Sequence, residues 1–316
     1  MNQVEKLRQS LHWLDSNLHR LSFNQVKEAL SNFLPRVPFL VTEFDNKPFY
    51  FRQREYSGMN VVYRARPIYD AGNRPHMTVE DISYIPRHLL DEWPKEFGRA
   101  NKPHESMFYG AFNPSTAAIE VLHSNADFMK KKSMMLTVGI WKFNEPLLLT
   151  DVPLSQKRHD SLYLDLKNTS GFNAKFDAEH FAANQRHIDG FALDPLERIT
   201  LDYFSDKFCE FNESNLHYLV SNYYADRVFG RYAEHPFDEG EGPTDGILYP
   251  SIANAYQEEN IALPPDIVDS KLTFIGAMHM WALGGDNKFN CNQIDKARAD
   301  EQGNLIWEKY GNRQSQ

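Results

Sequence analysis

The apolar residues of this chain change their spacing several times, and no regular repeat connects the changes. Residues 3–33 have leucines three and four residues apart, a spacing typical of amphipathic helices. Residues 60–70 alternate in the manner of a strand, and residues 134–143 and 145–152 have the composition of further strands. A doubly wound fold requires strands and helices to alternate regularly, and this chain lacks that rhythm. The sequence therefore predicts a mixed α+β domain.

The two ends of the chain differ from its middle. The first 33 residues have the pattern of a helix, a turn and a second helix, which Ser22 is placed to cap. We expect a helical N-terminal region over residues 1–55 that packs on an α+β domain over residues 56–283, because leucines at helical spacing need a surface to cover. We expect the polar residues 284–316 to form a loosely ordered C-terminal tail.

Charge and cysteine content exclude several classes of protein. A formal net charge of -9 argues against binding DNA or RNA through a broad basic surface. Cys209 and Cys291 are far apart and indicate no disulfide scaffold, which favours a reducing compartment. The N-terminus has no signal-peptide core, and no apolar run approaches the roughly 18 residues of a membrane span. We expect a cytoplasmic protein that binds neither nucleic acid nor membranes.

Familiar catalytic and nucleotide-binding motifs are absent from the sequence. It contains no GxGxxG, GxxxxGKS/T, HExxH or GxSxG. The twelve histidines do not cluster at the spacing of metal ligands, so we expect no metal site. Any site must therefore be sought in less conventional combinations of residues.

Residues 98–120 combine a Gly-Arg-x-Asn turn, an aromatic run and the start of a helix. Arg99 and Asn101 lie in the turn, Tyr109 lies in the aromatic run, and Glu120 lies about two turns into a helix that an Asn-Pro pair is placed to begin. Arginine suits a phosphate, an aromatic ring suits stacking, and a carboxylate suits a sugar. Each residue also has an ordinary alternative as a loop arginine, a core aromatic or a solvated helix flank.

Three further polar residues are associated with strand segments. Arg64 and Arg66 fall on the same face of the strand predicted at 60–70. They are either a pair of ligand-binding cations or the solvent face of an edge strand. Ser251 follows a short apolar strand, where it either contacts a ligand or serves as a turn residue. The residues by themselves leave these alternatives open.

Three segments of the chain resemble the three blocks of the RES domain and occur in the same order. They are VYRARP, GRANKPHESMFYGAFNPSTAAIEVL and DGILYPSIANAYQEENIALPPDIVDSKL, and the resemblance spans roughly residues 60–275. It implies an ADP-ribosyltransferase-like fold, in which helices flank a split antiparallel sheet. Known members of the family include bacterial toxins, often paired with a helix-turn-helix antitoxin, that degrade NAD+ by hydrolysis or phosphorolysis. At least one branch transfers ADP-ribose to a protein.

The family's functional residues can be transferred position by position. Its arginine falls on Arg64, with Arg66 as a close second, its pocket tyrosine on Tyr109, its glutamate on Glu120 and its serine on Ser251. The resemblance implies catalytic roles for the first arginine, the glutamate and the serine. It also implies NAD+ as the substrate, with inorganic phosphate as a co-substrate if the reaction is phosphorolysis, and it implies no cofactor.

The turn at residues 97–101 departs from the family's Gly-Gly-Arg-Trp-Asn loop at two positions. Phe97 replaces a glycine and Ala100 replaces an aromatic residue, so we expect a loop of different shape. Arg99 and Asn101 are retained and are expected to bind the substrate. The chain is also longer than the compact toxins, so toxicity and an antitoxin partner do not follow. The resemblance leaves open the oligomeric state and the choice among hydrolysis, phosphorolysis, ADP-ribosyl transfer and binding without turnover.

Overall fold

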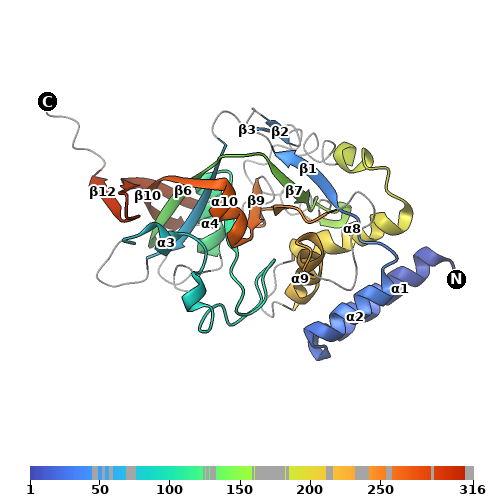
Figure 1. Ribbon diagram of the computed structural model, residues 1–316. Coiled ribbons are helices and arrows are strands. Elements are labelled where there is room, and N and C mark those ends of the chain that lie inside the picture. Colours follow the sequence, from blue (N-terminus) through green and yellow to red (C-terminus); the bar gives the residue numbers. More distant parts are fainter. Residues whose placement is uncertain are drawn as a thin grey trace.

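The fold is built on one large mixed sheet flanked by helices, shown in the computed structural model of Figure 1. The structure describes residues 1–44, 49–51, 54–56, 60–68, 76–123, 133–158, 185–210, 216–231, 242–253, 258–285 and 288–309, with single residues 125, 128, 160 and 182. Within these residues the sheet has ten strands in the order β1-β7-β8-β9-β5-β4-β6-β10-β11-β12. They are β1 (Leu40–Phe44), β4 (Val61–Pro67), β5 (Phe108–Ala111), β6 (Ser133–Phe143), β7 (Leu147–Asp151), β8 (Gly246–Pro250), β9 (Glu259–Leu263), β10 (Leu272–Gly285), β11 (Lys288–Ala299) and β12 (Leu305–Lys309).

The remaining elements surround this sheet. Strands β2 (Phe49–Phe51) and β3 (Arg54–Tyr56) pair with each other. The helices are α1 (Gln3–Asn17), α2 (Phe23–Phe33), α3 (Val79–Ile82), α4 (Pro114–His123), α8 (Pro195–Phe208), α9 (His217–Val228) and α10 (Pro265–Lys271), with short 3-10 turns at Leu18–Arg20 and Arg87–Leu89. Within the described residues, no helix has both the length and the apolar character needed to cross a membrane.

The sheet is split between β4 and β5. Strand β4 pairs with β6 along its whole length, from Val61 to Pro67, but it shares only the pair Tyr63–Ala111 with β5. A Cβ atom on Gly110 would lie 2.6 Å from Val62 Cγ2 and 3.0 Å from the Tyr63 carbonyl oxygen. Glycine therefore permits the two half-sheets to touch at this point. The prediction of an α+β fold with a split sheet and flanking helices is confirmed, although the parallel pairing of β7 with β8 makes the sheet mixed.

The N-terminal helices dock on α8 and α9, as their leucine spacing predicts. Leu7, Leu11 and Leu14 of α1 are buried in one apolar cluster with Phe204 of α8 and Tyr224 of α9. Figure 1 shows α1 and α2 side by side against this pair of helices. Burial of these leucines stabilises the docked arrangement by about 1.5–3 kcal/mol for each fully buried side chain.

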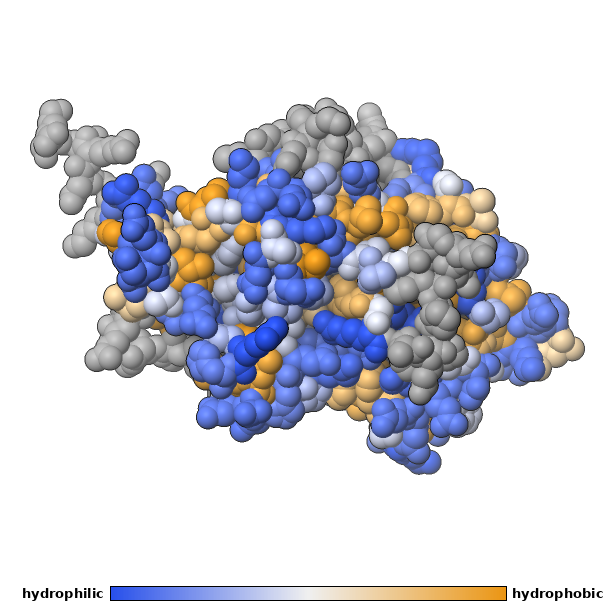
Figure 2. All heavy atoms as spheres, in the orientation of Figure 1, coloured by the Kyte–Doolittle hydropathy of each residue, from blue (hydrophilic) through white to orange (hydrophobic). Residues whose placement is uncertain are grey.

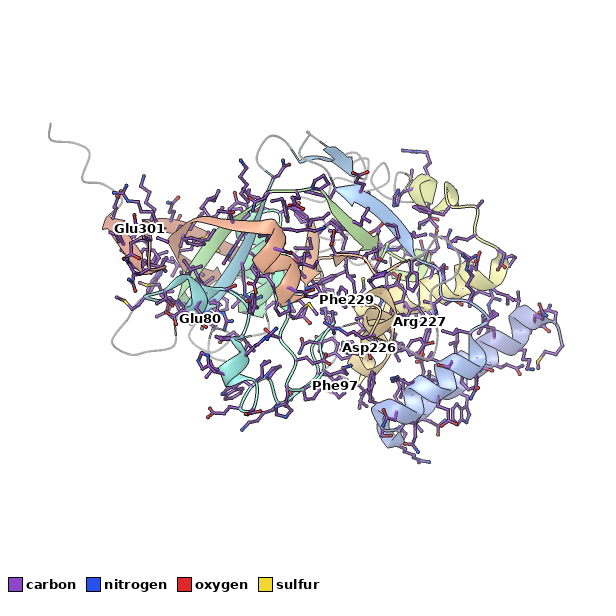
Figure 3. The ribbon with its side chains drawn as sticks, viewed as in Figure 1. Glu80, Phe97, Asp226, Arg227, Phe229 and Glu301 are labelled. Carbon is purple, nitrogen blue, oxygen red and sulfur yellow. The ribbon has the colours of Figure 1, made fainter. Side chains whose placement is uncertain are left out.

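The same cluster reaches the turn that precedes β5. Phe97 and Phe229 pack against it, and Figure 3 shows both side chains close to α9. The ring of Phe97 lies 5.4 Å from the ring of Phe23 at the start of α2. Phe97 does not have a positive φ angle, so the replacement of the family's glycine introduces no backbone strain here. The larger side chain instead links the N-terminal helices to the turn.

The structure differs from the sequence prediction at both ends of the main domain. Residues 1–55 are helical only as far as Phe33, and Leu40–Phe44 forms edge strand β1 against β7. Leu40 and Phe44 are buried, whereas Val41 and Glu43 are exposed, which is a strand pattern rather than a helical one.

The prediction of a loosely ordered tail over residues 284–316 is wrong for the residues that the structure describes, while residues 310–316 lie outside them. Residues 288–299 and 305–309 form β11 and β12, which extend the sheet beyond β10. Backbone hydrogen bonding tolerates polar side chains on the solvent face of such strands, while Ala297 and Leu305 are buried beneath. Hydrophilic residues indeed cover much of the face seen in Figure 2, with smaller hydrophobic areas between them.

Candidate functional site

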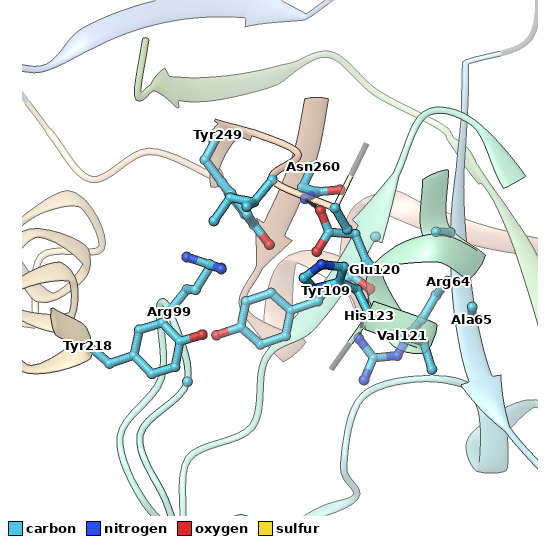
Figure 4. Close-up of a pocket in the computed structure, with 15 residues that line it drawn as sticks. Arg64, Ala65, Arg99, Tyr109, Glu120, Val121, His123, Tyr218, Tyr249 and Asn260 are labelled. Atoms are coloured by element: carbon cyan, nitrogen blue, oxygen red, sulfur yellow. Dashed lines mark hydrogen bonds between the residues drawn. The ribbon is translucent and has the colours of Figure 1, made fainter. Parts of the chain in front are cut away.

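A cavity of about 350 Å³ opens where the two half-sheets meet (Figure 4). Strands β4 and β5, helix α4, the turn at residues 98–99, the first turn of α9 and the β8–β9 region all contribute to its walls. This volume is at the lower end of the range for small-molecule sites. The polar side chains that line it are Arg64, Arg99, Tyr109, Glu120, His123, Tyr218, Tyr249 and Asn260.

Glu120 projects from α4 and is held by two buried donors. The helix begins where the Asn113 side chain accepts a hydrogen bond from the Ser115 backbone N–H at 2.8 Å. The Glu120 Oε1 atom accepts hydrogen bonds from Ser251 Oγ at 2.5 Å and from Asn260 Nδ2 at 2.7 Å. Both donors are buried, and hydrogen bonds to an ionised acceptor are roughly twice as strong as neutral ones. The carboxylate therefore has a fixed orientation at the cavity wall.

Arg64 projects from β4 and lines the cavity next to Tyr109. Its Nε donates to the Ser83 carbonyl oxygen at 3.1 Å, its Nη1 donates to the Tyr109 carbonyl oxygen at 2.9 Å, and the guanidinium lies 5.2 Å above the Phe108 ring. Burial, followed by the neighbouring Arg66, lowers the pKa of Arg64 well below its usual value. A buried cation next to another cation is unfavourable, so an anion in the cavity would be attracted to this guanidinium.

Arg66 lies behind Arg64. Its Nη2 donates to the Ser83 carbonyl oxygen at 2.7 Å, so both arginines use the same acceptor. Arg66 is not among the described residues that line the cavity. Arg66 would therefore influence an anion in the cavity through its positive charge and through its effect on Arg64.

The Gly-Arg-x-Asn turn is closed by the hydroxyl of Tyr109. This hydroxyl accepts from the Ala100 backbone N–H at 2.8 Å and donates to Asn101 Oδ1 at 2.7 Å. A Cβ atom on Gly98 would lie 2.3 Å from that same Oδ1 atom, so only glycine fits there. The ring of Tyr109 lines the cavity, as expected for stacking, while its hydroxyl and the buried Asn101 side chain hold the turn.

Helix α9 fixes the other side of the turn. Ser221 Oγ donates to the Arg99 carbonyl oxygen at 2.7 Å, and Asn222 Nδ2 donates to the Gly98 carbonyl oxygen at 2.6 Å. Lys102 Nζ lies 3.0 Å from the buried carboxylate of Asp226. These contacts give α9 a role in the site that sequence reasoning missed. The signal in the sequence was the pair Asn222 and Asp226, which lie one helical turn apart on α9.

Arg99 lies between two tyrosine rings. Its guanidinium is 5.3 Å from the ring centre of Tyr218 and 6.0 Å from that of Tyr249, and its Nη1 donates to the Phe208 carbonyl oxygen. Burial lowers the pKa of Arg99, but Tyr218, Tyr249 and then Glu120 outweigh it and raise the pKa. Arg99 is therefore a stable cation in the wall that it shares with the two rings.

The structure brings together four of the seven residues expected from the sequence. Arg64, Arg99, Tyr109 and Glu120 line the cavity, whereas Arg66, Asn101 and Ser251 lie one step behind the wall. Ser251, which the sequence left as either a ligand contact or a turn residue, donates its hydroxyl to Glu120.

Four polar residues of the cavity wall were not anticipated from the sequence. They are His123, Tyr218, Tyr249 and Asn260. Asn260 had a readable signal as an amide within an apolar strand, where a buried polar group needs a partner. Among the described residues, no group of three or more His, Cys, Asp or Glu side chains is arranged to hold a metal ion.

Comparison with known protein families agrees with the order of the sequence blocks. The family model described as RES domain matches residues 61–273, which is more than half of the chain and contains all seven expected site residues. No curated protein matches the chain.

Proposed function

Since the chain belongs to the RES-domain family, which is associated with NAD+-related activity and with toxin–antitoxin systems, we propose that it is an enzyme that consumes NAD+. The proposed reaction cleaves the bond between nicotinamide and ribose. The observation that carries this proposal is the orientation of Glu120, whose carboxylate is held by two buried donors in a cavity that also contains two arginines. A sugar flanked by phosphates is the substrate class that suits this combination of groups.

The chemistry assigned to Glu120 is the stabilisation of positive charge on the ribose. Cleavage of a glycosidic bond passes through a transition state with oxocarbenium character. Nicotinamide carries its positive charge on the ring and leaves as a neutral molecule, so strong acid catalysis is unnecessary. A carboxylate held by Ser251 and Asn260 can accept hydrogen bonds from ribose hydroxyls and stabilise the developing cation without having to reorganise.

Arg64 and Arg99 are proposed to bind the pyrophosphate. Arginine suits this role because its planar fork of N–H donors matches the oxygens of a phosphate. The hydrogen bonds of Arg64 to described residues use its Nε and Nη1 atoms, which leaves Nη2 for the ligand. The ring of Tyr109 is proposed to stack on nicotinamide or ribose, while its hydroxyl keeps the turn in place.

The second reactant determines the products. If water attacks the anomeric carbon, the carbon–nitrogen bond breaks and nicotinamide, ADP-ribose and a proton are formed. If inorganic phosphate attacks, the products are nicotinamide and ADP-ribose 1″-phosphate. In both cases the bonding electrons leave with nicotinamide and neutralise its ring.

The test is to incubate the purified protein with NAD+, with and without phosphate, and to separate the products by chromatography. Nicotinamide with ADP-ribose supports hydrolysis, and ADP-ribose 1″-phosphate supports phosphorolysis. ADP-ribose attached to a protein would replace the proposal with ADP-ribosyl transfer. An absence of NAD+ consumption under all conditions would contradict the proposal and favour a binding module.

A further inference from the structure

Tyr249 places a hydroxyl in the cavity without a partner from the protein. Only 5% of its surface is exposed, and it lines the cavity. No hydrogen bond joins its hydroxyl to any described residue, although Arg99 and Glu120 are close enough to affect its pKa. The hydroxyl belongs to a residue of the cavity wall and makes no hydrogen bond to a described residue, so it is available to a group bound in the cavity.

The hydroxyl is available as a donor. Burial, and then the charge of Glu120, raises the pKa of Tyr249 well above its usual value, so the phenol keeps its proton. Arg99, Tyr109 and Tyr218 are the other groups whose charge acts on this phenol. The preferred partner is therefore an acceptor, and the neighbouring guanidinium favours a negatively charged one.

Tyr218 and Arg99 complete a set of three donors. The Tyr218 hydroxyl has no hydrogen bond to a described residue, and the residue lines the same cavity from the first turn of α9. Among the described residues, the Arg99 guanidinium donates to the Phe208 carbonyl oxygen, which leaves further N–H groups of its fork for a ligand. Figure 4 shows Arg99 between the two tyrosines, on the side of the cavity away from Arg64.

We propose that Arg99, Tyr218 and Tyr249 form a binding site for one phosphoryl group, separate from Arg64. A tetrahedral oxyanion offers several oxygens at once, which matches one guanidinium flanked by two phenols. Glu120 faces the same cavity and would repel an anion that moved toward it, so the phosphoryl group stays on the Arg99 side.

The identity of the ligand rests on the proposed function, but the anion site does not. The phosphoryl group is either a phosphate of the dinucleotide or free inorganic phosphate, which would be the second reactant of phosphorolysis. Tyr218 belongs to α9, which lies between the second and third segments that resemble the RES domain. The proposed site therefore depends on a residue outside those three segments.

The test uses Tyr218→Phe, Tyr249→Phe and the double variant, with Tyr203→Phe as the matched control. The Tyr203 hydroxyl donates to Asp15 at 2.8 Å, and Tyr203 is not one of the described residues that line the cavity. Inorganic phosphate is titrated by calorimetry into each full-length protein. Nicotinamide mononucleotide and nicotinamide riboside, which differ by one phosphate, are titrated into the same variants carrying Glu120→Gln, so that turnover is suppressed.

We expect the double variant to lose roughly tenfold or more in affinity for a phosphate-containing ligand, because two hydrogen bonds to a charged group are removed. Weaker binding of the mononucleotide with unchanged binding of the riboside identifies a dinucleotide phosphate. Weaker binding of inorganic phosphate with unchanged mononucleotide binding identifies free phosphate. Changes within about twofold for both phosphate and mononucleotide, equal to those of Tyr203→Phe, would overturn the proposal.

Further measurements separate effects on folding and on NAD+ turnover from effects on phosphate binding. Tyr249→Phe removes a hydroxyl that makes no hydrogen bond to a described residue, so the melting temperature without ligand is expected to stay about the same. Arg99→Lys, which keeps the charge but loses the fork, is a second variant that is expected to weaken phosphate binding if the site is correct. A wild-type protein that binds phosphate through these residues but never releases nicotinamide would refute the proposed function and leave the anion site intact.

Discussion

Replacing Glu120 with glutamine separates charge from shape at the centre of the cavity. The amide oxygen of glutamine can still accept from Ser251 Oγ and Asn260 Nδ2, which lie 2.5 and 2.7 Å from Oε1 of the carboxylate. The side chain therefore keeps its position while the negative charge disappears. Any large loss of turnover then reports on the charge itself.

The expected magnitudes differ for folding, binding and rate. A hydrogen bond to a charged group contributes about 1.5–3 kcal/mol and a neutral one about 0.5–1.5, so each of the two bonds weakens by about 1 kcal/mol. Part of this loss is offset because a neutral amide is easier to bury than a carboxylate. Loss of one electrostatic contact to the transition state lowers kcat by roughly 10²–10³-fold, while a weakened ribose hydrogen bond lowers NAD+ affinity by about tenfold at most.

The assay combines single-turnover release of nicotinamide with calorimetric binding of NAD+. Glu28→Gln is the control, because it removes one carboxylate from the exposed surface of α2. Turnover of Glu120→Gln within about threefold of the wild type would refute the proposed role of the carboxylate. Weaker NAD+ binding with an unchanged single-turnover rate would also count against it, since it would mean that Glu120 binds the ground state and the transition state equally.

Three other changes test the parts of the site that support these groups. Tyr109→Phe leaves the Ala100 N–H and the Asn101 side chain without their shared partner, so we expect a loss of about 1–3 kcal/mol in thermal or urea unfolding, and unchanged stability would contradict the turn-closing role. Asn222→Ala removes the donor to the Gly98 carbonyl oxygen and is expected to raise KM for NAD+ severalfold, more than Glu28→Gln does. Burial, and then Arg99, lower the pKa of His217 to about 4. The unfolded state therefore binds more protons than the folded state between about pH 6.5 and 4. As a result, the free energy of unfolding falls as the pH drops through that window. His217→Phe should flatten this slope, and an unchanged slope in urea unfolding across that range would exclude His217 as its source.

Local sequence patterns were enough to predict several elements and four residues of the cavity wall. Leucine spacing and the Ser22 cap predicted α1 and α2, and an Asn-Pro pair predicted the start of α4 with Glu120 two turns along. Strand alternation placed Arg64 and Arg66 on one face, and both do donate to the same carbonyl oxygen. These features depend on residues within a few positions of one another, so periodicity and capping rules suffice to read them.

Which of these residues meet, and which additional residues join them in the cavity wall, depends on long-range packing of the chain. Asn260 is 140 residues from Glu120, and Ser221 is 122 residues from Arg99, whose carbonyl oxygen accepts its hydrogen bond. No local sequence pattern predicts either contact. The same is true of β11 and β12. Their polar side chains do not predict strands, which form because β11 pairs with β10 and β12 pairs with β11. Contacts of this kind form because the whole chain buries its apolar surface at once. Side chains that are distant in sequence are then brought to a single cavity between the two half-sheets.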